Sequence, residues 1–483
     1  MLRMLFRWTC VSMILGGWMA AAVAENPIPL GNHRELFADR FLLDRTEGAA
    51  LRLHEPQRAE TAIAFDKPWE GRYCGYVTVF KDGDLYRMYY RGLPGDRADG
   101  SDLEVTCYAE SPDSIHWTKP NLGLFEVNGT TENNVIVAKM APFSHNFAPW
   151  PDARPGAPAD ERYKALAGTS ESGLAAFVSG DGVHWRKLQE EAVFKKGAFD
   201  SQNVAFWSEA EGCYVCYFRC WTEGAFAGIR SVGRTTSPDF IHWTDPVQMG
   251  FGNTPIEHLY TNQTAPYYRA PHLYVAIAAR FMPGRRAVSP EEEKSLGIEG
   301  HYGGDCSDNV LMTSRGGNAY DRTFMEAFLK PGIGFENWTS RTNYPARGIV
   351  PTGEKEMSVY IQHNYGQPTG HVVRYALRPD GFASLNAPYQ GGEALTKPFT
   401  FEGKTLNLNF ATSAAGSIRV EVQDADGAVL EGFSAADCNE ILGNMLERPV
   451  LWKGNADVGR LAGTPIRLRF IMKDADLYSL QFN

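Results

Sequence analysis

The chain has 483 residues, of which 22% are charged and 43% are hydrophobic. This is the composition of a globular protein, and the length exceeds the roughly 250–300 residues that one hydrophobic core supports, so two or more domains are expected. The formal net charge of -10, with no basic stripe, argues against a nucleic-acid binder. After the N-terminus, no stretch reaches the roughly 18 consecutive apolar residues of a membrane-spanning helix.

The first 24 residues have the pattern of a secretory signal peptide. Arg3 and Arg7 give a positive start, the run from Trp8 to Met19 is mostly apolar, and Ala22-Val-Ala24 is a small-residue cleavage site. An uncleaved anchor is the alternative, but the apolar run is short for a membrane span. We therefore predict cleavage after Ala24 and a secreted or periplasmic mature protein that is not attached to the membrane.

A short turn motif recurs along the chain. Its clear copies run from Ser111 to Trp117, from Ser179 to Trp185 and from Ser237 to Trp243, and degenerate copies follow at Ser314–Gly317 and Arg378–Phe382. The Ser and Asp side chains of each copy can close a tight turn by accepting bonds from nearby backbone N–H groups. We assign the histidine of each clear copy to this structural repeat and not to a ligand set, and we expect the tryptophan to pack between repeats.

A second repeat sets the register of the strands. Ser144–Trp150, Ser201–Trp207 and Thr261–Tyr267 match one another, and Gly75–Phe80 and Asn343–Arg347 are weaker copies. Each copy leads into an aromatic second strand and then a third strand. The count gives five blades of four strands, which predicts an all-β chain with a five-bladed β-propeller.

The sequence changes character near its C-terminal end. Residues 391–483 alternate as antiparallel strands, with a hairpin turn at Asp424–Gly427, which predicts a β-sandwich docked on the side of the propeller. The predicted domains are thus the signal peptide (1–24), the propeller (25–390) and the sandwich (391–483). The charged insert 284–304 is interpreted as a loop or short helix over one face of the propeller.

The cysteines do not form a disulfide framework. There are eight, scattered along the chain, and one of them, Cys10, falls in the signal segment. Cys213 and Cys216 form a C-x-x-C motif inside a predicted strand, where residues three apart face opposite sides, so buried thiols are favoured over a metal site. No motif indicates a metalloprotease, a nucleotide site or a dinucleotide site, and we predict no metal and no cofactor.

The architecture resembles a known group of enzymes. A secreted five-bladed propeller with Ser-x-Asp-Gly-x-x-Trp turns and a C-terminal sandwich is similar to the five-bladed glycosidases, which include the invertases and arabinanases of glycoside hydrolase families 32 and 43. It also resembles exported bacterial proteins of polysaccharide-degrading organisms. The family's first-blade Asp motif is absent, Phe199-Asp200-Ser201 stands in place of Arg-Asp-Pro, and Glu257-His-Leu-Tyr260 stands in place of Glu-Cys-Pro. The resemblance implies a glycoside hydrolase and leaves the substrate open.

The repeat register predicts which carboxylates meet at one mouth of the propeller channel. The first strand of each blade lines the channel, so the residues just before it ring one mouth. This places Asp200, Glu257 and Glu70 on one rim, and Asp308 begins a later strand that can reach inward. Glycosidases use two carboxyl groups across the scissile bond. We predict Glu257 as the general acid and Asp200 as the base or nucleophile, with Glu70 and Asp308 as further candidates; solvated or arginine-paired carboxylates are the alternative.

Polar and aromatic residues at the same channel positions suit a hydroxyl-rich ligand. The six polar candidates are His145, Asn146, Gln202, Asn203, Asn262 and Gln263. Arg91 and Arg219 end second strands and are expected to pair with the carboxylates, and Tyr260 is a candidate for stacking on a sugar ring. The alternative is a polar network that satisfies the backbone of the channel itself. Asn262-Gln-Thr264 is also a glycosylation sequon, and a glycan there would block the mouth.

Two functions remain open, with a carbohydrate as the partner in both. The first is an exported glycoside hydrolase, and the second is a carbohydrate-binding propeller without catalysis. Two carboxyl groups across an open pocket favour hydrolysis, whereas carboxylates held in arginine pairs favour binding or a structural role. A sialidase-like enzyme would need a cluster of three arginines and usually six blades. A phosphorolytic enzyme fits poorly with export from the phosphate-rich cytoplasm.

Overall fold

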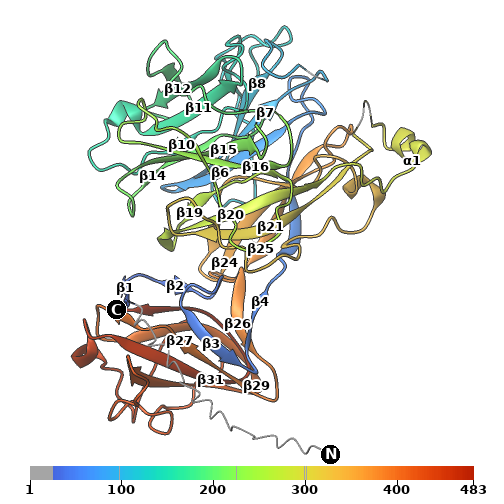
Figure 1. Cartoon of the computed structure of the whole chain (residues 1–483). Coiled ribbons are helices and arrows are strands. Elements are labelled where there is room, and N and C mark those ends of the chain that lie inside the picture. Colours follow the sequence, from blue (N-terminus) through green and yellow to red (C-terminus); the bar gives the residue numbers. More distant parts are fainter. Residues whose placement is uncertain (1–25, 97, 225, 299, 301) are drawn as a thin grey trace, which may run out of the picture.

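The computed structural model describes residues 26–96, 98–224, 226–298, 300 and 302–483. The predicted signal peptide lies outside these residues. The described part is almost entirely β structure, with one short α-helix, and no helix in it is long and apolar enough to cross a membrane. Five separate sheets form a five-bladed propeller, as predicted, and a sixth sheet forms a second domain below it (Figure 1).

The first three blades each contain four antiparallel strands in sequence order. Blade 1 consists of β6 (Gly75–Asp82), β7 (Leu85–Gly92), β8 (Val105–Ser111) and β9 (Val135–Val137). Blade 2 consists of β10 (Trp150–Pro151), β11 (Tyr163–Thr169), β12 (Gly173–Ser179) and β13 (Arg186–Lys187). Blade 3 consists of β14 (Val204–Ser208), β15 (Cys213–Trp221), β16 (Arg230–Ser237) and β17 (Val247–Gln248).

The last two blades depart from this plan. Their inner strands are broken in two, and both pieces pair with the same second strand. Blade 4 consists of β18 (Leu259–Thr261), β19 (Ala265–Tyr267), β20 (Ala270–Met282) and β21 (Cys306–Ser314). Blade 5 consists of β22 (Tyr344–Pro345), β23 (Val350–Gly353), β24 (Glu356–His363) and β25 (His371–Leu377), and its outer strand is β5 (Gln57–Ala64) from the N-terminal part of the chain. The propeller is therefore closed by strands from both of its ends.

The predicted turn motif has the same bonds in each clear copy. In the first copy, Ser111 Oγ lies 3.0 Å from Asp113 Oδ1, and His116 Nδ1 lies 2.7 Å from the other oxygen of Asp113. In the copies that begin at Ser179 and Ser237, the Ser–Asp distance is 3.1 Å and the His–Asp distance is again 2.7 Å. The indole N–H of each copy donates to the backbone carbonyl of the fourth turn residue at 3.1 Å. The turns are equivalent, and their histidines are structural, as predicted.

The second domain is built from both ends of the chain. The pairing of its ten strands follows one continuous sheet. Its strands are β1 (Ile28–Gly31), β2 (Glu35–Leu36), β3 (Leu43–Glu47), β4 (Ala50–Leu53), β26 (Ala383–Ala387), β27 (Gly392–Thr396), β28 (Phe399–Phe401), β29 (Leu406–Asp424), β30 (Asn444–Pro449) and β31 (Ile466–Phe482). Residues from both halves of β31 belong to one hydrophobic core, so the sheet folds over on itself as a sandwich.

The domain boundaries therefore differ from the expected ones. Residues 28–53 and Ala383–Ala387 were expected in the propeller, but they pair with the C-terminal strands. Glu35, for example, pairs with Leu480. Partners at opposite ends of the chain leave no local pattern in the sequence, which is why the pairing is not visible there.

The sandwich docks against blades 4 and 5, as expected. A shared core joins Leu36 and Phe382 to Tyr267 and Leu273 of blade 4. At its centre lies Asp380, which is fully buried and forms ion pairs with two arginines, one in each domain. Apolar contact and a buried charge network thus hold the two domains together.

The insert 284–304 carries the helix α1 (Pro290–Ser295), as predicted. Ser289 and Glu292 form a capping box at its start. Beyond the helix, Tyr302 packs with Tyr73 and Tyr365 beside blades 1 and 5. The insert therefore covers part of one face of the propeller (Figure 1).

The described cysteines are all free, in agreement with the sequence analysis. Cys213 and Cys216 lie in β15, the first partly exposed and the second buried. Burial raises the pKa of the Cys216 thiol to about 12. A thiol that resists ionisation is a poor metal ligand, which supports the structural interpretation of this motif.

Candidate active site at the channel mouth

One end of the propeller collects the residues that precede the inner strands and those that end the second strands. We call this end the mouth, and its residues are Tyr76, Arg91, Asp99, Asp200, Arg219, Arg230, Tyr260, Arg341, Tyr344 and Tyr365. The ring of Tyr260 in blade 4 lies beside the guanidinium groups of Arg219 and Arg230 from blade 3 and of Arg341 from the approach to blade 5. Side chains from several blades therefore meet at this end.

The backbone repeats at the mouth as the sequence register predicts. In four blades the aligned position adopts a left-handed conformation, with φ of 52° at Tyr76 and Asn146, 50° at Gln263 and 67° at Asn343. None of these residues is glycine, and left-handed backbone in other residues is unusual. Strain of this kind is retained where the surrounding structure demands it, and it is often found at functional sites.

The polar candidates that follow from this register lie inside the channel. His145, Asn146, Gln202, Asn203, Asn262 and Gln263 are each no more than 3% exposed. Gln202 donates to Thr78 of blade 1 at 2.6 Å, and Gln263 donates to Gln202 at 2.7 Å and to the carbonyl of Pro345 at 2.8 Å. These amides join the inner strands of different blades. The structure therefore favours the channel network over direct contact with a ligand.

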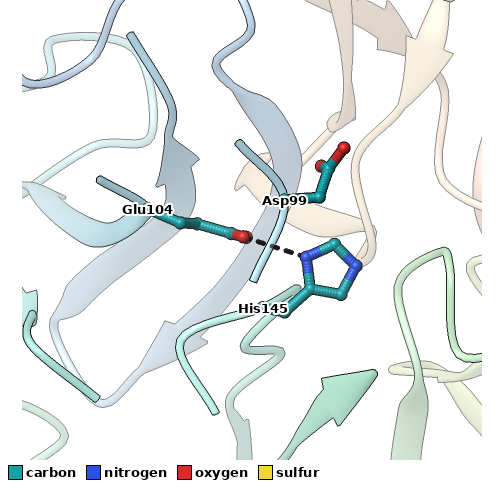
Figure 2. A group of neighbouring side chains, drawn as sticks. All are labelled: Asp99, Glu104 and His145. Carbon is teal, nitrogen blue, oxygen red and sulfur yellow. Dashed lines mark hydrogen bonds and ion pairs between the residues drawn. The ribbon is translucent and has the colours of Figure 1, made fainter. Parts of the chain in front are cut away.

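A carboxylate–imidazole pair lies directly under the mouth in blades 1 and 2. Glu104 and His145 face each other with 2.9 Å between Oε2 and Nδ1, and Asp99 lies beside the imidazole ring (Figure 2). Burial acts to raise the pKa of Glu104, but the charges of His145 and Arg91 hold it below its usual value. Asp99 is 42% exposed, and despite burial Arg91, His145 and Arg341 hold its pKa low as well.

These three side chains are also the group whose geometry best suits a metal ion. Their ligand atoms lie within 4.8 Å of one another. However, Asp99 already accepts from Arg91 at 2.7 Å, and Glu104 accepts from His145 and from the backbone N–H groups of Gly100 and Asn146. A cation would compete with the guanidinium at this position. The donor set therefore does not fit a resident metal.

Two of the mouth arginines hold the carboxylates of the rim. Arg91 bonds Asp99 and stacks on Tyr76, with its guanidinium carbon 4.6 Å from the ring centre. Arg219 donates to Asp200 at 2.8 Å and lies 3.8 Å from the ring centre of Tyr260. Arg219 pairs with one of the predicted carboxylates, whereas Arg91 pairs with Asp99, which was not among them.

The other two mouth arginines have no such partner. Among the residues that the structure describes, neither Arg230 nor Arg341 forms an ion pair with a carboxylate. Arg341 donates to the Tyr365 hydroxyl at 3.2 Å, and Arg230 lies 4.5 Å from the ring centre of Trp221. Burial and the nearby charge of Arg219 lower the pKa of Arg230. The mouth thus carries more positive charge than its own carboxylates balance.

An open cavity adjoins the mouth on blade 4. Its volume is about 630 Å³, within the range of small-molecule sites. Its charged and aromatic lining consists of Glu257, Arg280, Arg285, Asp308, Lys330 and Trp338. The backbone N–H of Arg230 donates to His258, which follows Glu257, so the cavity and the mouth are neighbours.

Two of the predicted catalytic carboxylates share this cavity. Arg280 bonds both: it lies 3.1 Å from Glu257, and it contacts Asp308 through two nitrogens at 2.8 and 2.5 Å. Arg322 adds a second bond to Glu257 at 2.9 Å. Glu257 thus contacts two guanidinium groups, and Asp308 contacts one through both of its oxygens.

The four predicted carboxylates therefore do not form one site. Glu70 is fully buried and bonded to Tyr90 and Lys119, each at 2.7 Å, so it is part of the core of blade 1. Asp200 is 49% exposed at the mouth. Only Glu257 and Asp308 line the same cavity. The expectation of a single pocket for all four is thus replaced by two neighbouring sites, the mouth and the blade 4 cavity.

Sequence reasoning missed several residues of these sites, above all Asp99, Glu104, Arg230 and Arg341. Asp99 and Glu104 lie in the loop between β7 and β8, whose density of charges and glycines was a usable signal. Arg341 lies just before the fifth copy of the second repeat, two residues from Asn343. Extending the aligned repeats by a few residues on each side would have found it.

Comparison with known proteins gives distant structural likenesses. No protein-family model and no curated protein matches the sequence. A solved structure named as a glycoside hydrolase is 13% identical, covering 68% of this chain and 93% of its own, with a TM-score of 0.43. A glycosyl hydrolase from Bacteroides ovatus is 13% identical over 68% and 95% of the two chains, with a TM-score of 0.38.

A third structure comes from work on a family of mannoside phosphorylases that contains glycoside hydrolases targeting β-1,2-mannosidic linkages in Candida mannan. It is 14% identical over 68% of this chain and 95% of its own, with a TM-score of 0.39.

Proposed function

We propose that the chain is an exported glycoside hydrolase whose substrate occupies the blade 4 cavity and extends over the mouth. The observation that carries this proposal is the cavity itself, in which Glu257 and Asp308 face the same open volume across Arg280. Paired carboxyl groups at one cavity are the common requirement of glycoside hydrolysis.

The two cavity carboxylates divide the roles of acid and base between them. One gives its proton to the leaving glycosidic oxygen, the other acts as base or nucleophile, and a water molecule supplies the oxygen of the new hydroxyl group. Trp338 lines the same cavity and offers a face on which a sugar ring can stack.

One observation favours a second function, which is carbohydrate binding without catalysis. Both cavity carboxylates are held by arginine, and Arg280 bonds them together. A pair locked in this way would bind sugar hydroxyl groups as acceptors and would leave the glycosidic bond intact. The two functions share the cavity and differ only in turnover.

The test is hydrolysis by the purified mature protein of a panel of aryl glycosides and of plant and marine polysaccharides. On any substrate that is cleaved, Glu257→Gln and Asp308→Asn should each lower turnover by roughly 10²–10⁴-fold. Asp160→Asn is the matched control, because Asp160 is an exposed carboxylate paired with Arg186 far from the cavity. Unchanged turnover in both cavity variants would overturn the assignment, and binding without cleavage across the panel would favour the second function.

A further inference from the structure

We propose that Arg230 and Arg341 bind an anionic group of the saccharide, so that the substrate is an acidic glycan. The anion is a carboxylate, as in a hexuronic acid, or a sulfate ester. The inference rests on the proposed function, since it concerns the sugar that extends from the blade 4 cavity over the mouth.

The charge balance of the mouth is the first argument. Arg91 and Arg219 are matched by Asp99 and Asp200, each through a direct bond. Arg230 and Arg341 add two positive charges, and neither forms a direct ion pair with a carboxylate of the described residues, although Asp200 and Asp99 lie close enough to interact electrostatically with them. The whole chain has a net charge of -10, so this local excess of positive charge runs against the overall composition. Charged groups taken out of water without a partner are unfavourable, and they are retained where a ligand completes them.

The surroundings of the two arginines are the second argument. Arg230 is packed among Trp221, Tyr260 and Phe281, with ring centres 4.5 to 5.4 Å from its guanidinium carbon, and its Nε is buried without a hydrogen-bond partner in the described structure. Arg341 lies against Tyr260, Tyr302 and Tyr365 at 5.1 to 5.5 Å. Aromatic rings fix each guanidinium in place. Arg341 gives one N–H to the Tyr365 hydroxyl, and its remaining donors and those of Arg230 can bind a planar or tetrahedral anion.

The position of the two arginines relative to the cavity is the third argument. Arg230 adjoins it through His258, the neighbour of Glu257. Arg341 adjoins it through the short segment that follows Trp338, where Asn343 bonds the carbonyl of Ser307 in the cavity wall. Both arginines also contact the ring of Tyr260. An anion bound between them would belong to a sugar next to the one in the cavity.

The backbone of Arg341 supports a functional role. Its φ is 58°, in the left-handed region that residues other than glycine seldom adopt. Arg341 forms no ion pair within the described structure that would account for this conformation. A residue held in such a conformation is a candidate for ligand contact.

The experiment compares matched acidic and neutral ligands in binding titrations by calorimetry. The first pair is oligogalacturonate and its fully methyl-esterified form, and the second is a sulfated galactan oligosaccharide and its desulfated form. We expect the acidic member of at least one pair to bind about tenfold or more tightly than its neutral partner, as for a charge-assisted hydrogen bond. Raising the salt concentration should weaken that preference.

Substitutions then locate the effect. Arg230→Gln and Arg341→Gln should each remove most of the preference for the acidic ligand, measured as the ratio of its affinity to that of the neutral partner. Arg341→Lys keeps the charge and should retain part of the preference, which guards against a variant that merely misfolds. Arg186→Gln is the control, because this arginine is exposed on blade 2 and pairs with Asp160.

Three results would overturn the inference. They are equal affinity for acidic and neutral ligands, no binding of either acidic ligand, and binding of inorganic sulfate or phosphate as tight as that of the acidic sugars. Hydrolysis of neutral glycans with no acidic preference would refute the anion site and leave the proposed hydrolase standing. Acidic preference without hydrolysis would refute the hydrolase and leave the anion site standing.

Discussion

The two ends of the propeller are built on opposite principles. At the turn end, where the third strands finish, blades 1 to 3 repeat one set of bonds between Ser, Asp, His and Trp. At the mouth, each blade contributes something different: Asp99 from blade 1, Asp200 from blade 3 and Arg341 from the approach to blade 5. The comparison shows that the recurring residues stabilise the fold, whereas the candidate functional residues lie at positions that differ from blade to blade.

Blade 5 shows how a turn residue can serve the domain interface instead of its own turn. Its aspartate, Asp380, has a left-handed backbone with φ of 65°, as Ser114, Gly182 and Phe240 have one residue after the turn aspartates of blades 1 to 3, and it is fully buried. It accepts from the Tyr267 hydroxyl at 2.8 Å and from Ser479 at 2.7 Å, and it pairs with Arg34 and Arg269. In blades 1 to 3 the turn aspartate is partly exposed, and its carboxylate bonds to residues of its own turn.

We therefore expect the largest loss of stability from substitution of Asp380. Asp380→Ala leaves two arginines without their shared carboxylate in a buried interface, so the free energy of unfolding should fall by about 3–5 kcal/mol. Chemical denaturation measures this loss, and a transition that splits into two steps would show that the domains have been uncoupled. A loss no greater than that of Asp181→Ala would contradict the contrast between the two turns.

A smaller effect is expected under the mouth, at the buried Glu104. Glu104→Gln removes the charge that bonds His145, at a cost of about 2 kcal/mol near neutral pH. Because the folded-state pKa of Glu104 lies below its ordinary value of 4.5, this stability is present above about pH 4.5 and is lost as the pH falls through the lower folded value. Denaturation curves of both proteins should thus converge in acid. A constant difference down to pH 2 would refute the buried pair.

At the turn end, we expect substitution of the turn aspartate to lower stability modestly and equally in blades 1, 2 and 3. Asp181→Ala removes two bonds to backbone N–H groups, each 2.8 Å long, and should cost about 1 kcal/mol, as for the loss of a helix N-cap. Asp113→Ala and Asp239→Ala should cost the same within error. Markedly unequal losses, measured by thermal unfolding, would show that the turns are not energetically equivalent.

The smallest expected effect is on the titration of His116 in the turn of blade 1. The bond from Asp113 raises the pKa of His116 above its ordinary value of 6.5. The pair's contribution to stability is therefore complete below pH 6.5 and is lost as the pH rises through the higher folded value. NMR of the imidazole protons should show this shift in the wild type and its disappearance in Asp113→Asn. A wild-type value at or below 6.5 would be evidence against the bond in solution.

Much of the fold was predictable because each copy of a repeat marks the same position in another blade. The turn that ends in Trp117 and its later copies fixed the number of blades, and the aligned positions of Asn146 and Gln263 share a left-handed backbone. What could not be predicted was the pairing of Glu35 with Leu480 and of the other strands from opposite ends of the chain. Such contacts depend on the assembled structure and leave no periodic pattern nearby.

The candidate site was predictable only in part, for a related reason. The repeat placed Glu257 before the inner strand of blade 4, but it also pointed to Glu70, which the core of blade 1 buries beside Lys119. Sequence register gives the position of a residue along a strand and does not say whether a neighbour will cover it. Asp99 and Glu104 lie in a loop between strands, where no repeat constrains the side chains at all.

The pairing of strands β1 to β4 also determines when the sandwich can complete its folding relative to synthesis of the chain. The partner of β2 in β31 is made only when the ribosome reaches Ser479 and Leu480, more than four hundred positions later, and the partners of β1, β3 and β4 in β28, β27 and β26 are made more than three hundred positions later. At about 5–20 residues per second, the wait lasts roughly 20–80 s. Throughout that time Leu30, Phe37 and Leu42, which end up in the sandwich core, remain without their partners. These residues lie near the start of the described chain, yet they are among the last to be buried. A chaperone that covers their apolar side chains can therefore act throughout translation.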